Sequence, residues 1–103
     1  MDTSLLKQKL TNIKYNDITD VVILRYWMLH TLVLCADEYR NAKGTGYSFK
    51  LLQQHKKLEQ FDVVIKEKSR KNTACKEDFE QAKLAVLECL EGITNLQAFV
   101  SAA

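Results

Sequence analysis

The sequence predicts an all-α protein, a four-helix up-and-down antiparallel bundle with one short N-terminal helix and three long ones. Two observations predict it. The 103-residue chain contains no proline and only three glycines, so it lacks the residues that the many tight turns of a β fold need. Apolar residues also recur every three or four positions over long segments, which is the period of an α-helix. A chain of this length forms one domain, which we place at residues 1–103.

The first helix is expected at residues 3–15, where Leu6, Leu10 and Ile13 share one face. Asp17 or Thr19 then offers a side-chain oxygen that can cap the next helix. The second helix is expected at residues 18–41 and is apolar nearly all round, so we expect other helices to surround it. Its two apolar stripes are Ile18, Val21, Met28, Leu32 and Cys35, and Ile23, Trp27 and Leu34.

Residues 43–47 form the clearest predicted loop, and Ser48 can cap a third helix at residues 49–70. Asn72 and Thr73 then break the pattern and offer a cap for the fourth helix. We read Gly92 as lying inside that helix, where a missing side chain allows another backbone to approach closely. The inner stripe of the third helix is Leu51, His55, Leu58, Phe61 and Ile65, and that of the fourth is Phe79, Ala82, Val86, Cys89, Ile93, Leu96 and Val100.

The three long helices are not expected to cover one another fully, because the second is apolar on all sides. We therefore expect a homodimer that completes the core. The alternative is that the short first helix closes it.

The compartment is expected to be the cytoplasm. The first residues carry an acid at Asp2 where an export signal needs basic residues. The longest apolar stretch contains Arg25 and is too short for a typical membrane span. The three cysteines are odd in number and include no closely spaced pair, which fits free thiols in a reducing compartment.

Charge is distributed unevenly along the chain. Residues 43–76 carry nine basic and three acidic side chains, whereas residues 77–103 carry one basic and five acidic ones. One interpretation is a patch on the third helix that binds nucleic acid or an acidic protein. The other is a solvated face whose lysines pair with acids of the fourth helix. The basic residues concerned are Lys56, Lys57, Lys66, Lys68, Arg70 and Lys71.

Arg25 and His30 have the spacing of an arginine, a few residues and a histidine. This spacing resembles the active-site signature of HEPN-type ribonucleases, which are small helical bundles and commonly dimers. The resemblance implies that His30 would transfer a proton and Arg25 would hold the phosphate. The two side chains lie about 140° apart around one helix, however. Structural roles therefore remain open: Arg25 could pair with Asp20, Asp37 or Glu91, and His30 could be a core histidine.

No metal, cofactor or small-molecule site is expected, because the acids of the fourth helix fall on its solvent side and the cysteines lie far from histidines. The sequence thus favours a non-enzymatic protein that binds another protein, itself, or both, and acts as an adaptor, chaperone, inhibitor or regulatory subunit. The alternatives are a nucleic-acid-binding protein and a HEPN-like ribonuclease. The expected contact residues are Tyr26 and Trp27, if exposed, together with the basic residues named above.

Overall fold

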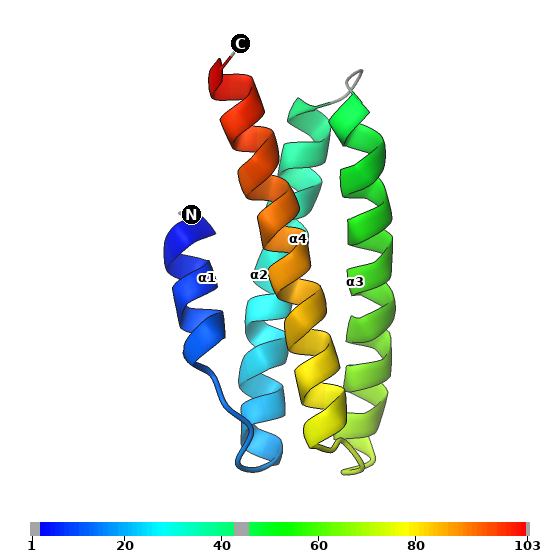
Figure 1. The fold of residues 1–103 in the computed structure, drawn as a ribbon. Coiled ribbons are helices and arrows are strands. Elements are labelled where there is room, and N and C mark those ends of the chain that lie inside the picture. The colour runs from blue at the N-terminus through cyan, green and yellow to red at the C-terminus, as the bar shows by residue number, and fades with distance from the viewer. Residues whose placement is uncertain (1–2, 43–45, 103) are drawn as a thin grey trace.

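Four antiparallel helices make up the chain in the computed structural model, which describes residues 3–42 and 46–102. The helices are α1 (Thr3–Asn12), α2 (Ile18–Asn41), α3 (Gly46–Arg70) and α4 (Lys76–Ala102). The three long helices pack against one another, and α1 lies along α4 with a smaller contact to α2 (Figure 1). The predicted all-α up-and-down bundle is confirmed.

The predicted end of the first helix is wrong by three residues, because α1 stops at Asn12. A lysine from α4 holds this end: the Lys83 ammonium donates hydrogen bonds to the backbone carbonyls of Thr11 (3.1 Å) and Ile13 (2.7 Å). The last carbonyls of a helix have no partner within it, so a cation from another element stabilises the end. The chain then turns away, and the ring of Tyr15 packs on that of Phe79.

The cap of α2 is Asp17, one of the two predicted candidates. Its carboxylate accepts from the backbone N–H of Thr19, and the carboxylate of Asp20 accepts in return from the backbone N–H of Asp17. This capping box satisfies N–H groups that the start of a helix leaves free. It fixes the start of α2 at Ile18, where the sequence predicted it.

The start of the third helix is earlier than predicted. Gly46, Tyr47 and Ser48 belong to α3, so Ser48 lies within the helix and is not its cap. Gly46 is exposed at the first position of the helix, where its conformational freedom costs less than in the interior. The rest of the predicted loop, residues 43–45, lies outside the described residues.

Asn72 ends α3 rather than capping α4. It adopts a left-handed backbone conformation (φ 58°), which asparagine tolerates better than most residues. The backbone N–H of Thr73 donates to the carbonyl of Lys68 (2.8 Å), and that of Asn72 donates to the carbonyl of Ser69 (3.1 Å). These two bonds form a Schellman motif. At the start of α4, Asp78 accepts from the backbone N–H of Cys75 (3.0 Å), so the predicted cap at Asn72 or Thr73 is wrong.

The core lies between α2, α3 and α4, and α1 packs at its edge, mainly on α4. The predicted stripe of α4 is buried from Phe79 to Ile93, while the side chains of Leu96 and Val100 lie outside the described ones. The buried apolar side chains of the other helices are Leu6, Leu10, Val21, Leu24, Met28, Cys35, Ala42, Leu51, Leu58 and Ile65.

Gly92 is buried against the chain's own α3. A Cβ atom built on Gly92 would lie 2.1 Å from the side-chain oxygen of Gln54. The close approach predicted at this glycine is therefore filled by an amide side chain of α3, and it offers no surface for a second molecule.

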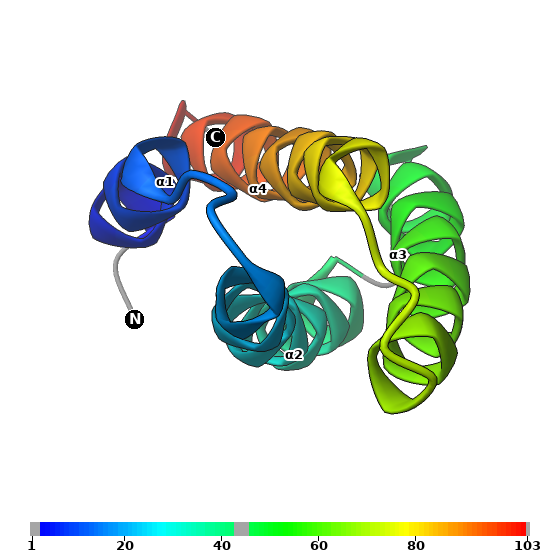
Figure 2. The same cartoon turned by 90° about the horizontal axis from the view of Figure 1, so that it is seen from below.

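The prediction that other helices surround α2 is wrong within the described chain. Seen end-on, α1, α4 and α3 lie to one side of α2, and no helix covers its other side (Figure 2). By length and composition α2 could cross a membrane, because the mean hydropathy of its most apolar 18-residue window is 1.5. Only 28% of that window is buried inside the bundle. α2 stays largely uncovered because α1 has only ten residues and packs mainly on α4. One side of α2 is therefore left without a neighbouring helix.

Candidate interaction surface

The open side of α2 carries an apolar stripe, which we call the α2 stripe. Its side chains are between 40% and 65% exposed, so they account for half of the large apolar side chains that the described residues present to solvent. Single exposed apolar residues are common, whereas several in a row mark an interaction surface. The α2 stripe consists of Val22, Ile23, Tyr26, Leu29 and Val33.

Helix geometry explains why four of these residues align, with Ile23 about a quarter turn to one side. Val22, Tyr26, Leu29 and Val33 follow a 4-3-4 spacing, which keeps side chains on one line of an α-helix. That line lies opposite the buried positions of α2, such as Met28. The helix is thus apolar on two sides, and the fold buries one of them.

A groove of about 260 Å³ runs between α2 and α3 beside the stripe. Tyr26 lines one wall and Lys66 the other, so the structure brings together one predicted aromatic anchor and one predicted basic contact. Lys66 has no carboxylate within ion-pair distance in the described part of the chain. The hydroxyl of Ser69 also lines the groove and is buried with no hydrogen-bond partner among the described residues. The groove therefore offers apolar area, an unpaired cation and an unsatisfied hydroxyl.

Arg25 lies at the edge of this groove and is paired with Asp62 of α3, at 3.0 Å. Both side chains are largely shielded from solvent. The three predicted partners of Arg25 are engaged elsewhere: Asp20 accepts from the backbone N–H of Asp17 in the capping box, Asp37 pairs with Arg40, and Glu91 pairs with Lys7. Arg25 does form an ion pair, as its structural interpretation expected, but the partner is Asp62, which was not among the three predicted residues.

His30 and Trp27 lie on the other flank of α2. The Tyr26 ring contacts His30 edge-on at 4.7 Å and Trp27 at 5.2 Å between ring centres. Trp27 is partly buried against the core, and the Lys9 ammonium of α1 lies 5.1 Å from its ring centre, within the range of a cation–π contact. Tyr26 is therefore the exposed member of the predicted aromatic pair, and Trp27 serves mainly to join α1 to α2.

The basic face of α3 is largely neutralised by the chain's own carboxylates. Lys57 pairs with Glu88 (3.2 Å), and Lys68 pairs with Asp78 (2.6 Å). Arg70 and Lys71 share the carboxylate of Glu67, at 2.7 and 3.3 Å. The predicted pairing of α3 lysines with α4 acids is therefore present, and Lys56 joins Lys66 as a basic residue with no such partner among the described residues.

The pairs also shift ionisation. The hydrogen bond from Lys68 holds the pKa of the Asp78 carboxyl below its usual value, with smaller help from bonds donated by Cys75. Arg70 and Lys71 likewise lower the pKa of Glu67. These carboxylates stay charged beside their cations: Asp78 neutralises Lys68, while Arg70 and Lys71 share the single negative charge of Glu67.

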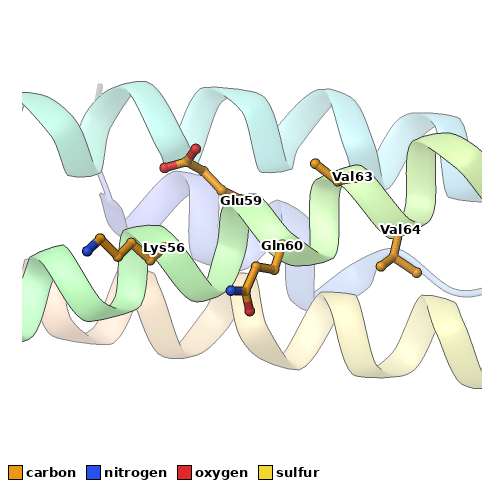
Figure 3. Close-up of a pocket in the computed structure, with 5 residues that line it drawn as sticks. All are labelled: Lys56, Glu59, Gln60, Val63 and Val64. Carbon is orange, nitrogen blue, oxygen red and sulfur yellow. The ribbon is translucent and has the colours of Figure 1, made fainter.

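Lys56 belongs to a second hollow, of about 490 Å³, on the outer side of α3 (Figure 3). Glu59 and Val63 lie on the side of α3 that faces α2, while Gln60 and Val64 lie on the side toward α4 (Figure 3). All five lining residues come from one helix. The hollow is thus an open surface beside the groove and not an enclosed binding site.

The three cysteines differ in burial. Cys35 and Cys89 are buried and Cys75 is exposed. A hydrogen bond with Cys35, together with burial, raises the pKa of the Cys89 thiol, which keeps it protonated and unreactive. No group of three or more potential metal ligands occurs among the described residues.

The sequence missed the α2–α3 groove because its walls are far apart along the chain. The 4-3-4 spacing of the stripe is visible in the sequence, but other helices were expected to surround α2, and Tyr26 was the one residue of this line predicted as a contact. Comparison with known protein families, with curated proteins and with solved structures finds no match to this chain.

Proposed function

We propose that this protein acts by binding a protein partner through the α2 stripe and the adjoining α2–α3 groove, and that it is not an enzyme. The observation that carries the proposal is the α2 stripe itself, large apolar side chains that the most apolar helix exposes to solvent, four of them on one line. Covering such a stripe removes apolar area from water, which is favourable by about 25 cal/mol per Å².

The composition of the surface also fits a protein partner. Aromatic and aliphatic side chains at the centre with cations at the rim are typical of protein interfaces. Tyr26 would be the central anchor, and Lys66 would lie at the rim. An adaptor, inhibitor or regulatory subunit would use this surface in the same way.

Nucleic-acid binding is less well supported. Four of the six basic residues predicted for it are held by carboxylates of the same chain, and unpaired cations are what neutralise phosphates. A HEPN-like ribonuclease is also less well supported, because Arg25 is tied to Asp62 and His30 packs against Tyr26 on the other flank of the helix. Equal RNA degradation by the wild type and His30→Ala would remove the ribonuclease alternative.

The test is site-specific photo-crosslinking in cells that express the chain. A photoreactive amino acid replaces Val33 in the stripe, and a matched variant carries it at Leu84 of α4, which is about as exposed but lies outside the stripe. We expect a covalent adduct of higher mass from position 33 and none from position 84. No adduct from either position, or equal adducts from both, would contradict the proposal.

A further inference from the structure

We propose that the occupant of the α2 stripe is a second copy of this chain, bound through an antiparallel α2–α2 contact. This inference rests on the proposed function and names its partner. Three features of the described residues carry it: the register of the stripe, the charge at its rim and the area available.

The register of the stripe is self-complementary. If two α2 helices run in opposite directions with the two-fold axis midway between Tyr26 and Leu29, Tyr26 of each copy lies opposite Leu29 of the other. The same operation places Val22 opposite Val33. All four layers of the contact are then apolar, as in the seam of an antiparallel coiled coil. The polar ends of the stripe, Thr19 and Asp37, fall outside these layers.

A parallel pair would use the stripe less well. It would place each residue opposite itself, so that Arg40 met Arg40 and Asp37 met Asp37 at the same end. Opposed like charges are unfavourable, but Arg40 and Asp37 neutralise each other within each chain, so the parallel arrangement is disfavoured only slightly. The antiparallel pair separates these residues to the two ends of the contact.

The rim of the groove supplies charge complementarity in the antiparallel arrangement. The Arg25–Asp62 pair fixes the level of α3 against α2. Lys66 is therefore roughly level with Val22, and Glu59 lies about two turns nearer the N-terminus of α3. The two-fold axis brings Glu59 of the second copy within about two turns of Lys66. The two side chains lean toward each other, because helical side chains point toward the N-terminus of their own helix. Glu59 lies on the α2 side of α3 (Figure 3), where its carboxylate is 2.6 Å from the Nδ1 atom of His55 in the same chain and its side chain is still 56% exposed. Lys66 has no carboxylate within ion-pair distance among the described residues.

Arg25 does not oppose this contact, because Asp62 already neutralises it. No other Asp, Glu, Lys or Arg occurs in α2 between Asp20 and Asp37. A second copy would therefore bury no unpaired charge at the centre of the interface.

The long side of the molecule is large enough in outline to hold a standard dimer interface. The molecule measures 46 × 23 × 18 Å, so its long side offers about 1,000 Å² against the roughly 800 Å² per partner of a standard interface. The stripe alone is too narrow to provide this, so the interface would include the α2–α3 groove.

The first measurement is the mass of the purified chain by analytical ultracentrifugation at micromolar concentrations. We expect twice the 11.9 kDa of one chain. Val33→Lys should raise the dimer dissociation constant at least about 100-fold, because the two-fold places a desolvated charge in the contact twice. Leu84→Lys, an equally exposed change outside the stripe, should leave it unchanged. Circular dichroism of both variants should match the wild type.

The second measurement tests the direction of the helices. In a Cys75→Ser background, which removes the exposed thiol, single cysteines are introduced and treated with a short thiol-specific bifunctional crosslinker. Leu29→Cys should crosslink with itself, since the two copies lie roughly 4–5 Å apart along the axis. Val33→Cys should not, since its copies lie roughly 16 Å apart. A mixture of Val22→Cys and Val33→Cys should crosslink.

Two results would overturn the inference. One is a monomeric mass even at 100 times the micromolar concentration of the first measurement. The other is self-crosslinking of Val33→Cys that is as efficient as that of Leu29→Cys. A monomer that still gives a position-33 adduct with a different protein in cells would overturn the inference alone and leave the proposed function standing. A monomer with no such adduct would overturn both.

Discussion

Replacing Gly92 by alanine tests how α3 and α4 pack where Gln54 meets Gly92. In an open helix interior the change stabilises by about 1 kcal/mol, because alanine loses less backbone entropy than glycine. Burial of the added methyl group contributes up to about 0.8 kcal/mol more. Gly92 is buried within α4, so both contributions are available if the methyl group has room.

The room is occupied by one flexible side chain. The new Cβ would lie 2.1 Å from the Gln54 oxygen and 2.9 Å from its amide carbon, so the amide must rotate away. Rotation breaks the long bond, 3.5 Å, from the Gln54 amide to the carbonyl of Glu88. It also imposes a less favoured rotamer, at about 0.5–1.5 kcal/mol. The Gln54 oxygen is buried with no hydrogen-bond partner among the described residues, so its displacement costs no bond.

The gain and the cost nearly cancel, so Gly92→Ala alone should change the free energy of unfolding by less than about 1 kcal/mol. In a Gln54→Ala background the same change should stabilise by about 1–2 kcal/mol. Urea unfolding of the wild type, both single variants and the double variant measures this coupling. Equal effects of Gly92→Ala in the two backgrounds would show that Gln54 does not fill the site. A loss above about 2 kcal/mol in both would show that backbone, and not a flexible side chain, limits the space.

Three further outcomes are expected. Lys83→Met should lower the free energy of unfolding by about 1–2 kcal/mol, because the end of α1 loses two charged hydrogen bonds. Amide hydrogen exchange should become faster in α1 more than in α3. An equal increase in both helices would argue against this role of Lys83. An aromatic disulfide reagent should label one thiol rapidly in the native protein and three in denaturant, since only Cys75 is exposed while Cys35 and Cys89 are buried, and native Cys75→Ser should give none. Lys68 lowers the pKa of Asp78 in the folded state, so the stabilisation from that carboxylate is complete above its unfolded pKa, near 4, and is lost as pH falls through the folded value. The stability advantage of wild type over Asp78→Asn should therefore shrink in acid unfolding series below about pH 4, and a constant difference would contradict the pairing.

The ends of the helices show how far local rules reach. The start of α2 at Ile18 follows from Asp17 and its neighbours, which satisfy the free N–H groups from within the same segment. The end of α1 depends instead on Lys83, some seventy residues away, so the local pattern alone predicted a longer helix. The predicted loop before α3 was also too long, because Tyr47 and Ser48 have no local feature that prevents a helix.

In the candidate site, too, the sequence shows which residues are present, while the packing of the helices decides which of them are accessible. The apolar side chains of the α2 stripe and the basic residues of α3 were visible in the sequence. Which of them remain available was not, because exposure depends on which helices become neighbours. Tyr26 is open while Trp27 is partly covered, and Lys66 is unpaired while Lys68 is held by Asp78.

The sequence by itself determined that this chain is a bundle of four helices, where α2 begins and ends, and which residues of α4 form the core. These properties follow from the 3.6-residue period and from caps made by near neighbours. Only the tertiary structure decided that a ten-residue α1 leaves one side of α2 bare, that Arg25 pairs with Asp62, and that Tyr26 and Lys66 share one groove. Each of these depends on contacts between residues distant in the chain, and such contacts are set by how whole helices pack and not by any local pattern.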